Sequence, residues 1–114
     1  MAPRLSHVIE FVSDMNRAVK FYRDIVGLPL KFQSAGWSEF SMGEIVLGLH
    51  PASEQNASGN VELGFTVPNL EQFHVEMTSQ GVQFPMPPRK QDFGGMLAQF
   101  VDSEGARVSV SGNE

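Results

Sequence analysis

The sequence predicts an α+β fold built from two βαβββ modules in tandem. A strand-like segment, a capped amphipathic helix and another strand-like segment follow one another near the N-terminus and again from residue 62. Equivalent positions lie 55 residues apart for His7 and Glu62, and 54 apart for Gly27 and Gly81. A polar, turn-rich segment at 51–60 separates the copies. We therefore expect one domain over 1–114, with modules at about 5–50 and 61–111 joined by this linker.

The first module is expected to begin with a strand at 6–12 and to continue into a helix. Ser13 and Asp14 are residues that cap helix N-termini, and Gly27 is a typical C-terminal stop. Between them the apolar residues recur with a period of 3.6: Met15, Ala18, Val19, Tyr22, Ile25 and Val26. Strands are predicted next at 28–32, 37–42 and 44–50.

The second module repeats this order. A strand is predicted at 62–67, and Asn69 with Gln72 three residues later favours a helix start. Helical periodicity continues until Gly81, and further strands are predicted at 82–84, 96–102 and 107–111. The segment 85–95 contains three prolines and a glycine pair. It is either a connector between strands or a loop that closes over a ligand, and Arg89 and Phe93 are its candidate ligand contacts.

Composition excludes several classes of function. The chain has 114 residues, 41% of them hydrophobic, which is enough for a small core that gains from a partner subunit. Its net charge of −5 works against binding nucleic acid or an anionic membrane. The absence of cysteine excludes disulfides and thiolate zinc sites. No apolar run is long enough to span a membrane, and the N-terminus lacks a secretory signal, so we expect a cytoplasmic protein.

Three segments resemble the vicinal oxygen chelate superfamily, which includes glyoxalase I, extradiol dioxygenases and bleomycin-resistance proteins. They are HVIEFVSDMNRAVKFYRDIVGLPL, the second module, and DFGGMLAQFVDSEGARVSV. The resemblance covers nearly the whole chain, and FYRDIVGL and DSEG are its most specific parts. It implies curved mixed sheets around a cavity and a homodimer that binds a small-molecule ligand.

The resemblance also implies where a metal would bind. Metal-binding members hold one divalent ion, such as Zn²⁺, Ni²⁺, Mn²⁺ or Fe²⁺, with His and carboxylate ligands from the first and last strand of each module. The first-strand positions match His7 and Glu62. The last-strand positions match Leu47 or Gly48 in one module and Ser109 in the other, and none of these is a usual metal ligand. We therefore expect a weak metal site or none.

Two histidines leave alternatives open. His7 is either a hydrogen-bonded residue of the sheet or a cavity residue, and its match with Glu62 favours the cavity. His50 lies two residues beyond Gly48, about 6.5 Å along the strand. It either faces solvent at the strand end or partly replaces the missing ligand.

Strand alternation predicts the rest of the cavity lining. If His7 points inward, Ile9 and Phe11 do too, and Gly64 and Thr66 follow Glu62. Phe11 and Trp37 would supply apolar walls, and the small residues Gly48 and Ser109 would leave room. The alternate residues would pack under the helices: Val8, Val12, Leu63, Phe65 and Val67. Glu10 interrupts this pattern, so it either reaches water at an edge or pairs with Arg17 or Lys20.

Three functions fit the sequence. The first is a glyoxalase-like lyase or isomerase, in which His7 and Glu62 hold a divalent ion and Glu62 is the catalytic base. The second is a metal-free dimer that sequesters a small molecule or antibiotic, as bleomycin-resistance proteins do. The third is a structural or regulatory dimer with a vestigial pocket. The acidic composition and the lost ligand positions suit the second.

Overall fold

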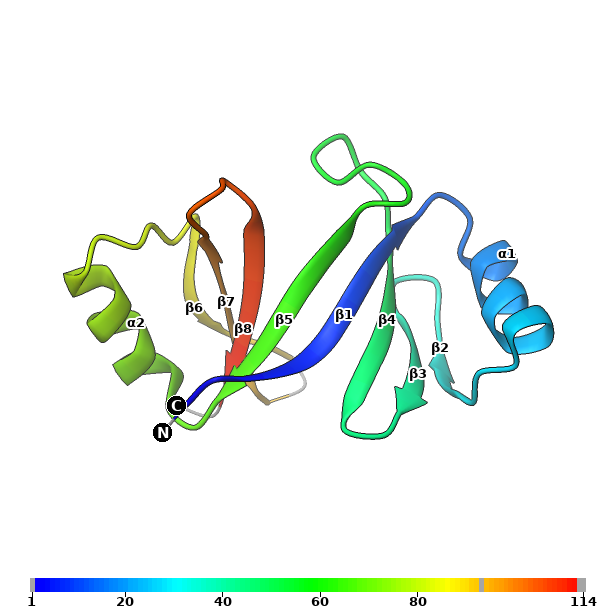
Figure 1. Cartoon of the computed structure of the whole chain (residues 1–114), viewed down its shortest axis with the longest axis horizontal. Helices are drawn as coiled ribbons and strands as arrows, with labels where there is room; N and C mark the ends of the chain where they lie inside the picture. The colour runs from blue at the N-terminus through cyan, green and yellow to red at the C-terminus, as the bar shows by residue number, and fades with distance from the viewer. Residues whose placement is uncertain (1, 93, 113–114) are drawn as a thin grey trace. The chain divides into compact units, whose positions relative to one another are not determined.

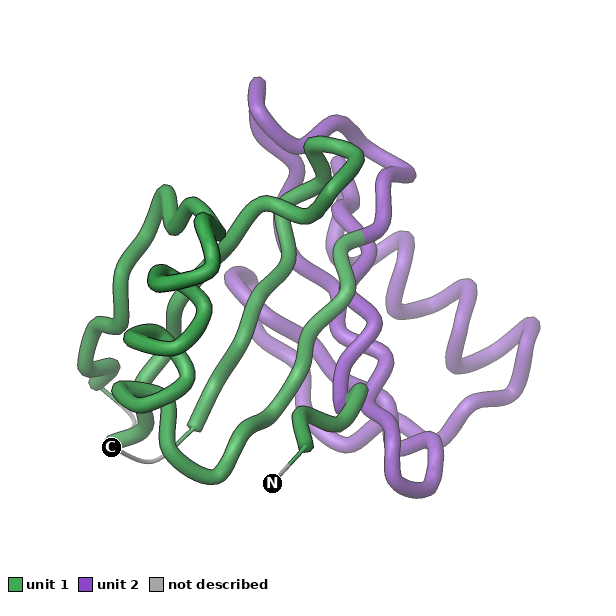
Figure 2. The backbone as a smooth tube through the Cα atoms, turned by 60° about the vertical axis from the view of Figure 1, so that its left-hand side comes forward, with its two compact units in different colours: residues 1–5, 62–114 green, residues 6–61 purple. Residues whose placement is uncertain are grey.

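The repeated order of strands and helix is present in the structure, a computed structural model that describes residues 2–92 and 94–112. Residues 6–61 form one compact unit, and residues 62–112 with the N-terminal residues up to Leu5 form the other, as Figure 2 shows. Each unit contains a four-stranded mixed sheet with a helical segment on one face (Figure 1). The predicted α+β fold with two βαβββ modules is confirmed.

The first unit contains α1 (Met15–Lys20), β2 (Leu30–Gln33), β3 (Ser38–Met42), β4 (Ile45–Pro51) and all but the first two residues of β1 (Arg4–Val12). Its strand order is β2-β3-β4-β1, with β1 parallel to β4 and the other neighbours antiparallel. The core between sheet and helix consists of the buried residues Val12, Val19, Phe40 and Leu49. Burying each of these side chains contributes roughly 1.5–3 kcal/mol.

The first helix differs from the regular helix that the sequence predicts. Asp14 caps it as expected, since its side chain accepts a hydrogen bond from the backbone of Arg17. After Lys20 the helix widens into a π-helical segment (Phe21–Val26), which Gly27 ends in a left-handed conformation. A π-helix has more residues per turn, so the apolar positions move off the buried face. Ile25 is consequently 75% exposed, although the periodicity places it with the core.

The second unit contains β5 (Val61–Val67), α2 (Leu70–Ser79), β6 (Met86–Lys90), β7 (Met96–Val101) and β8 (Arg107–Gly112). The strand order is β5-β8-β7-β6, with β5 parallel to β8 and the other neighbours antiparallel. Asn69 caps α2 by accepting a hydrogen bond from the backbone of Gln72, as predicted. The buried core comprises Val67, Leu70, Ala98 and Val110.

The second strand-like segment of the second module was assigned wrongly. The predicted strand at 82–84 is not a strand; Phe84 instead packs against the core beside Phe73 and Phe100. Residues 86–90, expected in a connector or ligand loop, form β6. Two prolines are tolerated there because β6 lies at the end of this unit's strand order, and its pairing with β7 is irregular between Met86 and Arg89.

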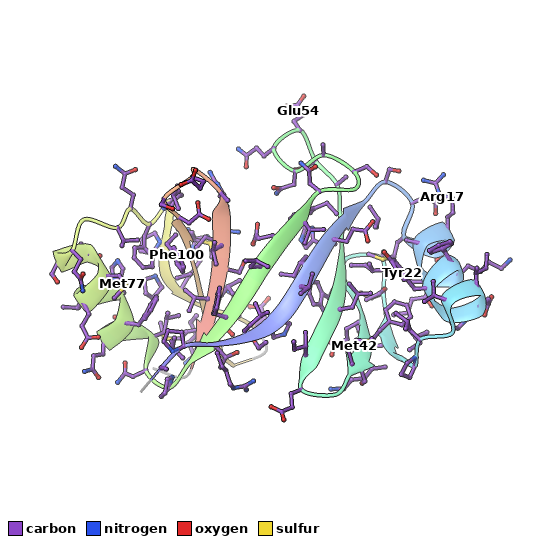
Figure 3. The ribbon with its side chains drawn as sticks, viewed as in Figure 1. Arg17, Tyr22, Met42, Glu54, Met77 and Phe100 are labelled. Atoms are coloured by element: carbon purple, nitrogen blue, oxygen red, sulfur yellow. The ribbon has the colours of Figure 1, made fainter. Side chains whose placement is uncertain are left out.

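Glu10 also differs from both predicted alternatives. Glu10 is half-buried, and its carboxylate accepts a 2.5 Å hydrogen bond from the hydroxyl of Tyr22. The ion pairs of the described residues do not join it to Arg17 or Lys20. Figure 3 shows Tyr22 on the side of its helical segment that faces the strands, where it packs on the core residues. The hydrogen bond therefore satisfies a charged residue on the helix-covered face of the sheet.

This hydrogen bond predicts a loss of stability at high pH. Donation to Glu10, burial and the negative charge of Glu10 raise the pKa of Tyr22 to about 12, from 10.0. The contribution is therefore complete below pH 10 and is lost as the pH rises towards 12. Tyr22→Phe should lower the free energy of unfolding by about 1 kcal/mol at neutral pH. The free energy of unfolding of this variant should not show the loss between pH 10 and 12 that the wild type shows. Urea unfolding across this range tests it.

The same experiment has a direct control. Tyr22 is the chain's one tyrosine, so phenolate absorbance reports its titration alone. A titration midpoint near 10 in the folded protein, or parallel stability curves for the wild type and Tyr22→Phe, would contradict the prediction.

Candidate functional site

The register of β1 and β4 identifies the side chains that share the sheet face opposite α1. His7, Ile9 and Phe11 pair with Val46, Gly48 and His50, respectively. Residues paired across parallel strands point to the same side of a sheet. Leu47 packs against the helix-side core instead, so Gly48 is the residue of β4 that occupies the last-strand position on the His7 face.

Trp37 covers Gly48. A Cβ atom placed on Gly48 would lie only 2.1 Å from the end of the Trp37 ring. The indole is held from its other side, since its Nε1 donates a 2.8 Å hydrogen bond to Glu39. Lys31 lies 3.7 Å from the second oxygen of Glu39 and completes this support. Any side chain at this position would have to displace the ring, so the place of a β4 metal ligand is taken by Trp37, which directly precedes β3.

The two histidines of this sheet have different surroundings. His7 is half-buried, and its Nδ1 lies 2.8 Å from the hydroxyl of Ser6. His50 is exposed, and its Nδ1 lies 2.9 Å from the carbonyl oxygen of Pro51. A carbonyl only accepts, so Nδ1 is the donor in this contact. His50 also meets Phe11 edge to face at 5.7 Å, which makes a small aromatic cluster.

In the other unit Glu62 lies at the centre of a polar network on the face opposite α2. Glu62 is only 6% exposed, and Ser109 donates a hydrogen bond to its Oε2. Gln99 donates a second one to the same atom at 3.3 Å. Arg107 in turn donates to the amide oxygen of Gln99 at 3.3 Å. The carboxylate is thus fixed by two neutral donors.

Two of the remaining predicted ligand contacts, Thr66 and Arg89, lie on strands of the second unit. Thr66 lies 3.4 Å from the hydroxyl of Ser111, and Arg89 pairs with Leu97 on β7. Phe93 lies outside the described residues. Their roles in ligand binding stay predictions, as does that of Glu62 as a base.

Sequence reasoning missed Gln99, Arg107 and Glu39. Gln99 is a polar residue two positions from two apolar ones, Leu97 and Val101, that alternation places on its own face. Gln99 on β7 pairs with Ser109 on β8, which places its side chain within hydrogen-bond distance of Glu62. Glu39 is likewise two residues from Trp37. The alternation of residues along each strand indicates which face a side chain is on. Which residue of the neighbouring strand it meets follows only from the strand register.

These donors do not fit a metal site with three or more protein ligands. The indole of Trp37 covers Gly48, and the hydroxyl of Ser109 donates a hydrogen bond to Glu62. Among residues 2–92 and 94–112, no three histidine, aspartate or glutamate side chains gather as they would around an ion. His7 and Glu62 remain as the two donors that match first-strand ligand positions, and they belong to different units.

Comparisons with known proteins agree with this fold. A sequence model described as the Glyoxalase/Bleomycin resistance protein/Dioxygenase superfamily matches residues 4–110. A curated bleomycin resistance protein of Klebsiella pneumoniae is 27% identical, covering 89% of this chain and 86% of the relative.

Solved structures of lower identity share the fold. A Streptomyces coelicolor methylmalonyl-CoA epimerase, solved with 2-nitronate-propionyl-CoA, has a TM-score of 0.81 at 16% identity, covering 96% of this chain and 94% of that one. A Legionella pneumophila structure titled as an NAD-dependent benzaldehyde dehydrogenase has a TM-score of 0.76 at 23% identity, covering 95% and 98%.

The covered glycine predicts a position-specific effect. Gly48→Ala should lower the free energy of unfolding by roughly 1–3 kcal/mol, because the new methyl displaces the Trp37 ring. Trp37 is the chain's one tryptophan, so its emission spectrum should shift as well. Denaturant unfolding and fluorescence measure the two effects.

Gly36→Ala is the matched control, since a Cβ there meets nothing within 4 Å. Equal stability of the two alanine variants, with unchanged Trp37 emission, would show that the ring does not cover Gly48. Replacing Trp37 by leucine should remove most of the penalty of Gly48→Ala.

Proposed function

The chain belongs to the Glyoxalase/Bleomycin resistance protein/Dioxygenase superfamily, and we propose that it is a metal-independent small-molecule binder of the bleomycin-resistance type. The observation that carries the proposal is the indole of Trp37 over Gly48. An indole ring at a last-strand ligand position leaves that position without a metal donor. It also adds an aromatic surface on which a planar molecule can stack.

The second last-strand position supports the same function. Ser109 uses its hydroxyl to hold the buried carboxylate of Glu62, which leaves it a poor ligand for a divalent ion. Catalytic metal sites usually have three protein ligands and an open position. With Gly48 and Ser109 at these positions, residues 2–92 and 94–112 do not gather the metal donors that a glyoxalase-like lyase or isomerase would use.

The side chains that remain suit binding. Trp37 and His50 place aromatic groups on the face of the first sheet opposite α1, beside the buried ring of Phe11. Glu62 places a nearly buried carboxylate on the face of the second sheet opposite α2. The net charge of −5 attracts cationic molecules over a longer range. A small, partly aromatic cation, which includes antibiotics such as bleomycin, is the ligand class that these groups fit.

Thermal unfolding with and without a chelator tests the proposal. In EDTA, bleomycin at about 100 times its Kd should add about 2.7 kcal/mol of stability, which corresponds to a rise in Tm on the order of 10 °C. Zn²⁺, Ni²⁺, Mn²⁺ or Fe²⁺ alone should leave Tm unchanged. Quenching of Trp37 emission by bleomycin would report contact with the indole.

His7→Ala distinguishes the two family chemistries. A metal-independent binder predicts no ion effect in the wild type or in His7→Ala. A rise in Tm with any of these ions that His7→Ala abolishes would establish a metal site and contradict the proposal. Absence of an EDTA-resistant shift with bleomycin and with aromatic cations would contradict it too.

A further inference from the structure

Glu62 has one carboxylate oxygen fixed and the other available. Both hydrogen bonds that it makes within the described residues, from Ser109 and Gln99, end on Oε2. No buried side-chain oxygen or nitrogen in the described part of the chain lacks a hydrogen-bond partner. Because Oε1 accepts no hydrogen bond from a described residue, it is not fully buried, although the residue as a whole is only 6% exposed. The network holds the carboxylate in one orientation and presents Oε1 outward.

Among the residues that the structure describes, no cation pairs with this buried carboxylate. Ser109 and Gln99 are neutral donors. The ion pairs of the described residues are Arg23 with Asp24 and Lys31 with Glu39, and neither involves Glu62. A buried charge is costly unless a counter-charge and hydrogen bonds compensate it. A positive group that donates a hydrogen bond would compensate this cost.

Arg107 does not provide that charge, because Gln99 stands between them. The guanidinium donates to Oε1 of the Gln99 amide. Since a guanidinium only donates, this contact turns the NH₂ group of Gln99 towards Glu62. Gln99 and Arg107 are therefore positioning residues: they fix Oε2 of Glu62 and leave Oε1 to a ligand.

We propose that Oε1 of Glu62 accepts a charged N–H donor of the ligand, so the protein selects small molecules that carry an ammonium, amidinium or protonated ring nitrogen. This rests on the proposed small-molecule binding and adds its charge selectivity. The carboxylate at a first-strand ligand position then pairs with an organic cation. Its neutral donors support this role, because they orient the carboxylate without neutralising it.

A matched pair of probes tests the selectivity. 9-Aminoacridine is cationic at neutral pH and acridine is neutral there, while their ring systems are the same. Calorimetric titration in EDTA should give the wild type a roughly 10- to 100-fold lower Kd for 9-aminoacridine, the range of a charge-assisted hydrogen bond. Glu62→Gln should remove this advantage and change the Kd of acridine by less than about twofold.

Glu71→Gln is the control variant, because it removes the same charge from an exposed residue of α2. It should preserve the selectivity, which separates a contact at Glu62 from the general effect of net charge. Arg107→Leu leaves the Glu62 charge in place but frees the Gln99 amide to rotate. It should weaken 9-aminoacridine binding by a few-fold and leave acridine unchanged, which a purely structural role of the network would not produce.

The outcomes separate this inference from the proposed function. Equal affinity of the wild type for both probes, or selectivity retained in Glu62→Gln, overturns the inference while small-molecule binding stands. Binding of neither probe also overturns it, and bleomycin binding in EDTA then decides the proposed function separately. Should Glu62→Gln fail to fold, the ratio of the two affinities in the wild type and in Glu71→Gln still decides the question.

Discussion

The parallel pairing of the first strand with the last strand of each half determines which side chains meet on a face. In the first half this pairing sets Ile9 beside Gly48, and in the second it sets Gly64 beside Ser109. Ile9 and Gly64 each lie two residues after a first-strand position, His7 and Glu62. Gly48 and Ser109 are therefore structurally equivalent. A shift of one residue would turn both to the helix-covered face and expose the apolar core residues.

The two halves fill this equivalent position in different ways. In the first half Gly48 has no side chain, and the Trp37 ring, anchored by Glu39, takes the space. In the second half the glycine is on the neighbouring strand, at Gly64, and the side chain of Ser109 reaches Glu62. Each pair thus includes one residue without a side chain. One half presents an aromatic surface there, and the other a hydroxyl that orients a carboxylate.

Most of the fold follows from local sequence patterns. The 55-residue repeat, the caps at Asp14 and Asn69 and the strand alternation predict the elements because they depend on neighbours in the chain. The edge strand β6 was missed because its prolines disfavour a strand, and only its place in the strand order makes them acceptable. Local patterns cannot supply that information.

The sequence predicts which candidate positions share a sheet face, but not the contacts that their side chains make. Alternation and the family resemblance identified His7, Glu62, Gly48 and Ser109. The hydrogen bond between Tyr22 and Glu10 depends on where the helix places the phenol, which the π-helical segment changes. The approach of Gln99 to Glu62 depends on the register of two strands. Both contacts join residues that are distant in sequence. The periodicity of a sequence reports only on residues within one helix or strand, so it does not predict such pairs.

The division between the two faces of each sheet explains how the polar groups are compatible with a small protein's stability. The apolar residues that carry most of the burial, such as Phe40, Leu49 and Val110, lie on the helix side. The opposite faces carry Trp37, Glu62 and Ser109, each satisfied by a hydrogen bond to a neighbouring side chain. Substitutions on the faces opposite the helices therefore leave the helix-side cores intact. Such a division allows proteins of one fold to carry a metal ligand, an aromatic ring or a hydroxyl on the face opposite the helices while the helix-side core stays the same.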